Sequence, residues 1–151
     1  MRVLALDPGT KETAFVSWSS AGKSVFAKNI ASNEEMLKML QENAIAGTHD
    51  LLAIEMVACY GMAVGREVFE TCLWIGRFIQ VWPKEYVLIY RKDVKVHMCH
   101  SARAKDGNVR QSLIDRFGGR GTKKNPGPLY GISTHMWAAL AVAVYTGDRY
   151  A

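Results

Sequence analysis

The sequence contains few cysteines and no long apolar run, and these absences exclude several classes of protein. Only three cysteines occur among 151 residues, and Cys59, Cys72 and Cys99 are widely spaced, with no C-x-x-C pair. An odd number at this spacing argues against a disulfide framework and against a structural zinc site. No stretch reaches the length of an uncharged membrane span, and the first residues lack the pattern of a signal or transit peptide. We therefore expect a cytosolic protein with reduced thiols.

Apolar runs and turn signals predict one domain over residues 1–151 with an α/β fold. The expected strands are Arg2–Asp7, Thr13–Trp18, Lys23–Ile30, Asp50–Glu55 and Glu85–Tyr90. The turn "SSAG" predicts a hairpin of the second and third strands. The expected helices begin at about Asn33 and cover about Met62–Val81, Gly107–Phe117 and about Ser133–Thr146. A hairpin followed by strand–helix–strand units forms a mixed sheet with helices on its faces, and its sites lie beyond the carboxyl ends of the strands.

Positive charge is concentrated in one segment, between Arg91 and Lys124. This segment holds ten lysines and arginines against three aspartates, a net charge of +7, whereas the whole chain carries +5. The remainder of the chain is therefore slightly acidic, at −2. A local basic patch on an acidic body favours a polyanionic partner such as a nucleic acid. The alternative is a basic face that contacts only solvent.

Two carboxylates occupy equivalent positions at the ends of predicted strands. Asp7 ends "RVLALD" and Glu55 ends "DLLAIE". If these strands are parallel neighbours, the two carboxylates lie together at one edge of the sheet, where their repulsion favours a bound cation. A hard cation such as Mg²⁺ takes carboxylate oxygens and retains waters for a substrate phosphate. The alternative is that Asp7 forms a turn with Pro8 and Gly9 and that Glu55 precedes a helix.

An ordered set of motifs resembles one family of nucleases over nearly the full length of the chain. These motifs are "LALDPGTKETAFV", "LLAIEMVACYGMAVGREVFETCLWIGRF", "DVKV", "DGNVRQSLIDRFG" and "HMWAALAVAVYTG". Together they resemble the RuvC-like Holliday junction resolvases of the ribonuclease-H-like superfamily, in particular the phage and prophage members. The first motif alone is weak, because D-x-G-T also opens actin-like ATPases. The resemblance implies a ribonuclease-H-like mixed five-stranded sheet flanked by helices, in a bacterial or phage-infected host cell.

The resemblance implies a set of metal ligands. Asp7 and Glu55 match the first two ligands, and His135 matches a third position where the family carries aspartate or histidine. The implied cofactor is Mg²⁺ or Mn²⁺, with two ions per active site, which would clamp the attacking and leaving oxygens of a phosphodiester. Taken without the family, His135 reads as an ordinary histidine at the start of a helix.

One position departs from the family pattern. Many bacterial relatives carry a further aspartate three residues after the His135 position, where this chain has Ala138. Asp148 is no substitute, because thirteen residues along a helix span roughly 20 Å. Asp106 and Asp115 are candidate substitutes. A site that works with three ligands, or an inactivating change at Ala138, would equally account for the departure.

Further residues are assigned to catalysis and to DNA binding. The resemblance places Lys95 and Lys105 near the catalytic cleft, where a lysine binds a phosphate oxygen or stabilises charge in the transition state. Tyr60 follows the Glu55 strand, where the family often carries an aromatic residue that stacks on bases; the alternative is a tyrosine packed on the protein surface. The expected DNA-binding residues are Tyr60, Arg91, Lys92, Arg103, Arg110, Lys123 and Lys124.

The predicted activity is metal-dependent endonuclease cleavage of four-way or other branched DNA by two symmetric cuts. Two symmetric cuts favour a homodimer with twofold symmetry. The helix expected over Met62–Val81 is the candidate interface, because Trp74, Phe78 and Trp82 exceed what one sheet face requires; the alternative is a fully buried helix. Other functions that the sequence allows are a YqgF-like RNA nuclease and a non-catalytic junction-binding protein with a degenerate site.

Overall fold

The protein is built on one five-stranded mixed sheet. A computed structural model describes the backbone of residues 1–151 and the side chains of all of them except residue 43. The strands are β1 (Arg2–Pro8), β2 (Glu12–Ser19), β3 (Ser24–Ser32), β4 (Leu51–Met56) and β5 (Tyr86–Tyr90). Their order across the sheet is β3-β2-β1-β4-β5. The first three strands pair antiparallel, whereas β4 lies parallel to β1 and β5 parallel to β4. The five predicted strands and the mixed sheet are confirmed.

The short apolar strand β1 lies at the centre of the sheet and is buried on both faces. Its side chains alternate between two hydrophobic clusters, because successive residues of a strand point to opposite faces. Val3 and Ala5 join the cluster on one face. Leu4 and Leu6 join the cluster on the other face. This two-sided burial explains why the strand is a continuous apolar run without polar alternation.

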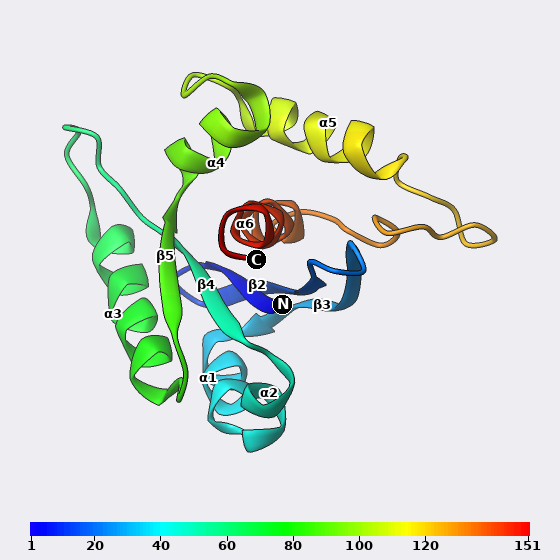
Figure 1. Cartoon of the computed structure of the whole chain (residues 1–151). Coiled ribbons are helices and arrows are strands. Elements are labelled where there is room, and N and C mark those ends of the chain that lie inside the picture. The colour runs from blue at the N-terminus through cyan, green and yellow to red at the C-terminus, as the bar shows by residue number, and fades with distance from the viewer.

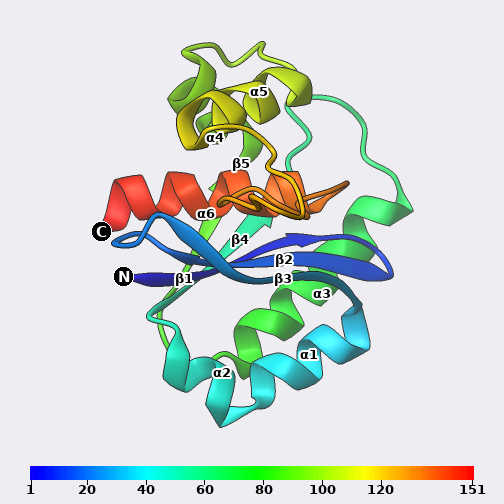
Figure 2. The same ribbon diagram turned by 90° about the vertical axis from the view of Figure 1, so that its right-hand side faces the viewer.

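Helices cover both faces of the sheet (Figure 1). The helices are α1 (Asn33–Gln41), α2 (Asn43–Thr48), α3 (Arg66–Val81), α4 (Arg91–Cys99), α5 (Asp106–Phe117) and α6 (Met136–Tyr150). Helix α6 lies across one face, with α4 and α5 beyond it, while α1, α2 and α3 lie on the opposite side (Figure 2). Ala139, Ala141 and Ala143 are buried in α6, and such small side chains allow a helix to approach the strands closely. Among the described helices, none has the length and apolarity required to cross a bilayer.

The helices differ from the prediction in their number and in several of their boundaries. Helices α2 and α4 were not expected. In α4 only Val94 is buried among nine residues, so the segment lacks the apolar period that identifies a helix. Helix α3 begins at Arg66 and α6 at Met136, later than predicted. His135 is consequently the residue that precedes α6, and not a residue within it.

Two of the three aromatic residues expected at a dimer interface are buried within this chain, and the third, Trp74, is half-buried. Phe78 and Trp82 are buried in the core of this chain, where they pack with residues of α1, β1 and β4. They cover the apolar side chains that the sheet presents on this face. The exposed apolar residues of α3 are instead Phe69, at 61% exposure, and Leu73, at 69%. These two residues lie four positions apart and therefore share one face of the helix.

Candidate active site

The topology of the sheet brings Asp7 and Glu55 together. Strands β1 and β4 are parallel neighbours, with Leu6 opposite Ile54, so the next residue of each strand is a carboxylate at the same edge. Both side chains point to the face that α6 covers, because they share the alternation of Ala5 and Ala53, which pack in the α6 cluster. The side chains are only 11% and 10% exposed. The expected apposition of these two carboxylates is therefore present in the structure.

The charges of this pair are incompletely neutralised. Burial, together with the neighbouring carboxylate of Glu55, raises the pKa of Asp7 from its ordinary 3.8 to about 8. Oε2 of Glu55 is buried and has no hydrogen-bond partner while Asp7 is ionised; when Asp7 is protonated, it shares its proton with Glu55. A buried carboxylate oxygen without a partner is costly. Both features would be relieved by a cation placed between the two carboxylates.

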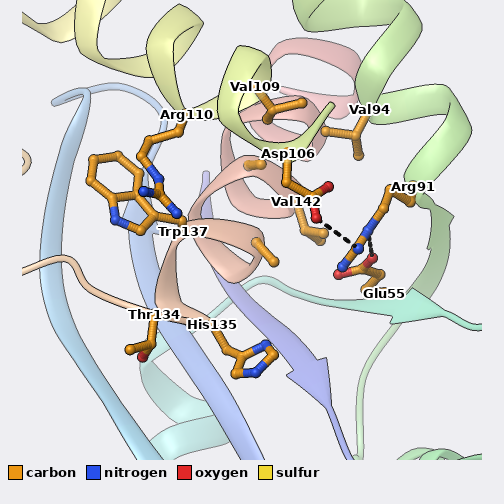
Figure 3. A pocket seen from close by; sticks show the side chains of 12 residues that line it. Glu55, Arg91, Val94, Asp106, Val109, Arg110, Thr134, His135, Trp137 and Val142 are labelled. Atoms are coloured by element: carbon orange, nitrogen blue, oxygen red, sulfur yellow. Dashed lines mark hydrogen bonds and ion pairs between the residues drawn. The ribbon is translucent and has the colours of Figure 1, made fainter. Parts of the chain in front are cut away.

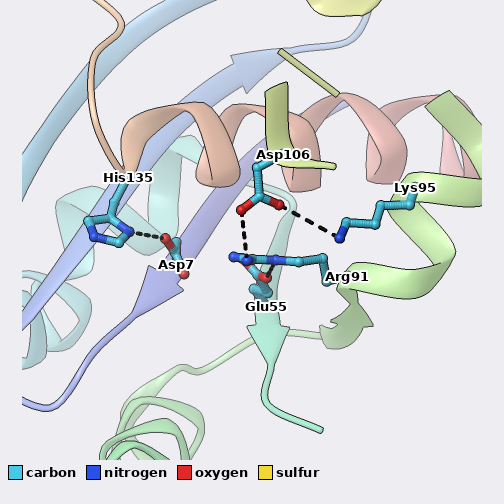
Figure 4. Close-up of polar contacts among 6 residues, drawn as sticks. All are labelled: Asp7, Glu55, Arg91, Lys95, Asp106 and His135. Carbon is cyan, nitrogen blue, oxygen red and sulfur yellow. Dashed lines mark hydrogen bonds and ion pairs between the residues drawn. The ribbon is translucent and has the colours of Figure 1, made fainter. Parts of the chain in front are cut away.

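His135 lies next to Asp7. Its Nδ1 atom is 3.1 Å from Oδ2 of Asp7, and its ring is 78% exposed (Figure 4). The preceding residue, Thr134, has a positive φ of 47°, a conformation that is uncommon for a residue with a branched side chain. This tight turn ends the loop before α6 at the carboxyl edge of the sheet. A histidine distant in sequence thereby reaches the carboxylate pair.

Arg91 occupies the other side of the pair, a position that sequence reasoning did not foresee. Its Nε donates a hydrogen bond of 2.6 Å to Oε1 of Glu55, and its Nη1 lies 3.4 Å from Oδ2 of Asp106. Lys95 follows, with Nζ 3.8 Å from Oδ1 of Asp106. Burial alone would lower the pKa of Arg91, but the hydrogen bond to Glu55 and the nearby carboxylates raise it above its ordinary value. Arg91 is thus a fixed positive charge inside the site.

A signal for Arg91 was present in the sequence. It follows β5 directly, and β5 is the third strand that ends at this edge of the sheet. Strand ends at one edge meet in space, so the rule that selected Asp7 and Glu55 also selects Arg91. Its membership of a basic segment led to an assignment as a DNA contact instead. In the structure its guanidinium bonds to Glu55 within the protein.

Two hollows open beside the cluster. One pocket of about 290 Å³ is lined by Glu55, Arg91, Asp106, His135 and Ala138, among others (Figure 3). A second hollow of about 390 Å³ lies on the other side of His135 and includes Asp7. Arg91 and His135 line both hollows. The cluster is therefore accessible to a substrate and to ions from solvent.

The residues present fit a divalent cation, although they do not form a complete set of ligands around one position. Asp7, Glu55 and His135 supply two carboxylates and an imidazole, a donor set that suits Mg²⁺ or Mn²⁺. The unpartnered Oε2 of Glu55 is the observation that favours such an ion. Among the described side chains, no three histidine, cysteine or acidic residues already surround a common metal position. The structure therefore supplies two converging carboxylates with a histidine at their side.

The remaining candidate site residues are Asp106, Asp115, Lys95 and Lys105, and the structure brings only two of them to the carboxylate pair. Asp106 is the first residue of α5 and enters the cluster through Arg91 and Lys95. Asp115 accepts a hydrogen bond from Gln111 on the same helix and lines neither hollow. Lys105 precedes α5, is exposed and has no ion pair in the cluster. Asp106 and Lys95 thus join the site, whereas Asp115 and Lys105 do not.

Apart from Tyr60, the expected DNA-binding residues lie on α4, on α5 or in the segments that follow these two helices. Tyr60 is exposed in the loop after β4 and has a positive φ of 48°. Besides Arg91, whose side chain is 43% exposed, four of the basic residues are exposed to solvent: Lys92, Arg103, Lys123 and Lys124. Arg110 is half-buried, with its guanidinium carbon 5.5 Å from the centre of the Trp137 ring. The exposed lysines and arginines are available for phosphate contacts.

Comparison with known proteins establishes the fold. No protein-family model matches the sequence, and no curated protein matches it. A solved structure of Thermus thermophilus RuvC matches with a TM-score of 0.72 and 16% identity, over 96% of this chain and 92% of that chain. The structure of T. thermophilus RuvC in complex with a Holliday junction substrate matches with a TM-score of 0.68 and 14% identity, over the same shares. This chain therefore has the RuvC-like, ribonuclease-H-like fold: a mixed five-stranded sheet flanked by helices.

Proposed function

We propose that this protein is a metal-dependent endonuclease that hydrolyses phosphodiester bonds in four-way or other branched DNA. The observation that carries the proposal is the pair Asp7 and Glu55, held side by side with Oε2 of Glu55 buried and unpartnered. The likeness in fold to a RuvC whose structure contains a Holliday junction substrate supports DNA as the substrate. The motif resemblance extends the proposal to a phage or prophage type of enzyme that acts in the cytoplasm of a bacterial cell.

In the proposed mechanism, Asp7, Glu55 and His135 would hold Mg²⁺ or Mn²⁺. Such an ion acidifies water and stabilises negative charge on the phosphate oxygens. Arg91 and Lys95 stand on the opposite side of Glu55, where their positive charges attract the scissile phosphate and stabilise its developing charge. Asp106 holds both cationic groups in place through its two oxygens. The hollow beside Ala138 leaves room for the phosphate group.

Exposed basic residues would bind the DNA backbone on either side of the cleft. Lys92 and Arg103 lie on α4 and on the segment after it, and Lys123 and Lys124 lie in the loop before α6. Each phosphate contact releases counterions, so junction affinity would fall steeply with salt concentration. Tyr60, exposed in its loop, would stack on an unpaired base at the branch point.

A homodimer is part of the proposal. Two symmetric cuts in a junction require two active sites, which a twofold dimer supplies. The exposed pair Phe69 and Leu73 on α3 is the apolar surface that such a dimer would cover. This pair replaces the set of aromatic residues expected from the sequence, most of which are buried in the core.

A second function, junction binding without cleavage, is favoured by one observation. The described side chains contain no finished group of three metal ligands, and Ala138 supplies no donor atom to the pocket. A protein of this kind would bind branched DNA equally well with and without divalent ions. A metal titration of cleavage separates it from the proposed nuclease.

The deciding experiment is cleavage of a synthetic four-way junction with Mg²⁺ and with Mn²⁺. We expect cleavage by the wild type and a loss of at least about 10³-fold in Asp7→Asn, with junction binding retained. Asp93→Asn is the matched control, because Asp93 is an exposed aspartate of α4 that does not line the pocket. Full activity of Asp7→Asn would overturn the proposal. A structured RNA as parallel substrate tests whether the enzyme acts on RNA instead.

A further inference from the structure

We propose that the guanidinium of Arg91 takes the place of a second divalent cation, so that the active site binds one metal ion. The inference rests on the proposed metal-dependent nuclease function and concerns how many ions that site accepts. It differs from the two ions expected from the sequence. Four features of the described residues carry it: the backbone position of Arg91, the two oxygens of Glu55, the contacts of Asp106 and the charge of the cluster.

The backbone holds Arg91 at the carboxylate pair. Strand β5 runs parallel to β4, with Tyr90 opposite Met56 and Ile89 opposite Glu55. Arg91 is the next residue and begins α4. The paired strand and the helix together fix its Cα close to Glu55. The backbone position of Arg91 therefore allows its guanidinium to contact Glu55.

Glu55 presents one oxygen to Arg91 and keeps the other free. Nε of Arg91 donates to Oε1 at 2.6 Å, whereas Oε2 is buried and without a partner. A carboxylate can bind a guanidinium and a metal ion at the same time through its two oxygens. A metal ion at Oε2, next to Asp7, leaves the bond to Arg91 intact. Arg91 is thus compatible with a first ion, and it occupies the oxygen that a second ion would use.

Asp106 holds the outer side of the guanidinium. One of its oxygens lies 3.4 Å from Nη1 of Arg91 and the other 3.8 Å from Nζ of Lys95 (Figure 4). Both oxygens therefore already face positive side chains. Asp106 acts as a partner of Arg91 in this arrangement and is not free as an additional metal ligand. Ala138, which lines the same pocket, has no atom that binds a cation.

The charge of the cluster matches one divalent ion. Once a metal ion has displaced the proton of Asp7, the cluster contains three ionised carboxylates, Asp7, Glu55 and Asp106. Its two cationic groups are Arg91 and Lys95. One net negative charge remains, because His135 is neutral when it acts as a ligand. A single divalent ion changes this balance to one positive charge, which a phosphodiester neutralises. A second divalent ion would raise the net charge of the site to three positive charges before the substrate binds. The positive charge already present therefore repels the second ion.

The test is the stoichiometry of Mn²⁺ binding in the absence of DNA, measured by calorimetry and by electron paramagnetic resonance. We expect one Mn²⁺ per chain in the wild type. Arg91→Gln removes the fixed charge and frees Oε1 of Glu55, so we expect Mn²⁺ affinity to rise at least about tenfold and a second ion to bind. Arg149→Gln is the matched control, since it removes an exposed arginine far along α6, and it is expected to bind one ion as the wild type does.

Arg91→Lys and the metal dependence of cleavage provide independent readouts. Arg91→Lys keeps the charge, so we expect one ion and an affinity close to that of the wild type. Wild-type cleavage is expected to follow Mn²⁺ concentration with a Hill coefficient near one. Thermal unfolding verifies that each variant is folded. If Arg91→Gln does not fold, the number of Mn²⁺ ions bound by the wild type still tests the inference.

The contradicting outcomes separate this inference from the proposed function. Two ions per wild-type chain, or unchanged binding in a folded Arg91→Gln, would overturn the role assigned to Arg91 while leaving the nuclease proposal intact. No Mn²⁺ binding at millimolar concentrations, together with no cleavage, would overturn both. Single-ion binding that is unaffected by Asp7→Asn would show that the ion lies elsewhere, and would overturn the assignment of the site.

Discussion

The two ends of helix α6 carry ionic clusters of opposite character. At its N-terminal end, Asp7 faces a second carboxylate, and burial with this neighbour raises the pKa of Asp7 to about 8. At its C-terminal end, Asp148 receives two hydrogen bonds of 2.6 Å from Arg116 and lies 2.8 Å from Nε2 of His97. The hydrogen bonds from Arg116 outweigh burial and lower the pKa of Asp148 below its ordinary value. The pKa of an aspartate is thus raised at one end of α6 and lowered at the other.

The difference separates a carboxylate that connects helices from a carboxylate that we propose to bind a metal ion. The Asp148 cluster joins one side chain each from α4, α5 and α6, so it fastens α4 and α5 to the helix that packs on the sheet. Its charges are matched by partners within the protein. In the cluster at Asp7, an oxygen of Glu55 remains without a partner. Incomplete neutralisation of this kind is typical of sites that bind an ion or substrate.

The largest expected contrast is in catalysis. Glu55→Gln removes the carboxylate that would hold the metal, so we expect junction cleavage to fall by at least about 10³-fold. Asp148→Asn, at the other end of α6, is expected to change the cleavage rate by less than about threefold, because it alters no group near the carboxylate pair. Single-turnover cleavage assays at saturating Mg²⁺ check both values. Equal losses in the two variants would contradict the division between the clusters.

The next contrast is the dependence of stability on pH without metal. The folded Asp7 has a raised pKa, so between about pH 4 and pH 8 the unfolded chain releases its proton while the folded chain retains it. Stability is therefore expected to decrease as pH rises through this range. Asp7→Asn is expected to abolish this decrease and to be more stable than the wild type at pH 8.5. Thermal unfolding from pH 4 to pH 9 in a chelating buffer measures the effect, and an unchanged profile in the variant would contradict it.

A smaller effect of the opposite sign is expected at Asp148. Its folded pKa is lowered, so its contribution to stability is present above its unfolded pKa and is lost as pH falls through the folded pKa. At pH 7 we expect Asp148→Asn to cost about 1–2 kcal/mol of unfolding free energy, a range that allows for partial exposure of the pair. The cost is expected to decrease as pH falls through the lowered folded pKa of Asp148. Urea unfolding at pH 7 and at acidic pH measures both quantities.

The smallest effects are expected from single exposed lysines. Lys124→Ala is expected to weaken junction binding by a few-fold and to reduce the salt dependence of binding by about one counterion, as one phosphate contact does. Lys23→Ala is the matched control, since Lys23 lies in the β2–β3 turn, outside the basic segment. Fluorescence anisotropy over a range of salt concentrations measures the slope. An unchanged slope for Lys124→Ala would remove this lysine from the DNA interface.

Much of the fold was predictable from local patterns. The apolar runs of β1 and β4 identify buried strands. Ser32 caps α1 by accepting a hydrogen bond from the backbone of Glu35, a role that serine favours at the position before a helix. Helix α4 was not predicted because only Val94 among its nine residues is buried, so it lacks an apolar period. Its position depends on contacts with α5 and α6, which a local pattern does not contain.

The candidate site was predictable only in part. A carboxylate at the end of each of two apolar strands is visible in the sequence, because strand ends define where parallel neighbours meet. The partners of the carboxylates are not visible, because nothing in the local sequence distinguishes Arg91 or Arg116 from the other basic residues around them. Arg91 bonds to Glu55 across 36 positions and Arg116 bonds to Asp148 across 32. Such distant pairs depend on how helices pack on the sheet.

By itself, the sequence predicted the strands and the mixed sheet and placed Asp7 and Glu55 at the ends of two strands, because the periodicity of burial is a local property. The parallel pairing that brings the two carboxylates together was a condition of that prediction, and the strand order meets it. Only the tertiary structure decided which positive charges face which carboxylates. It placed Arg116 on Asp148 and Arg91 on one oxygen of Glu55, and it left the other oxygen of Glu55 without a partner. The physical reason is that hydrogen bonds of a few ångströms between distant residues depend on the packed positions of whole helices.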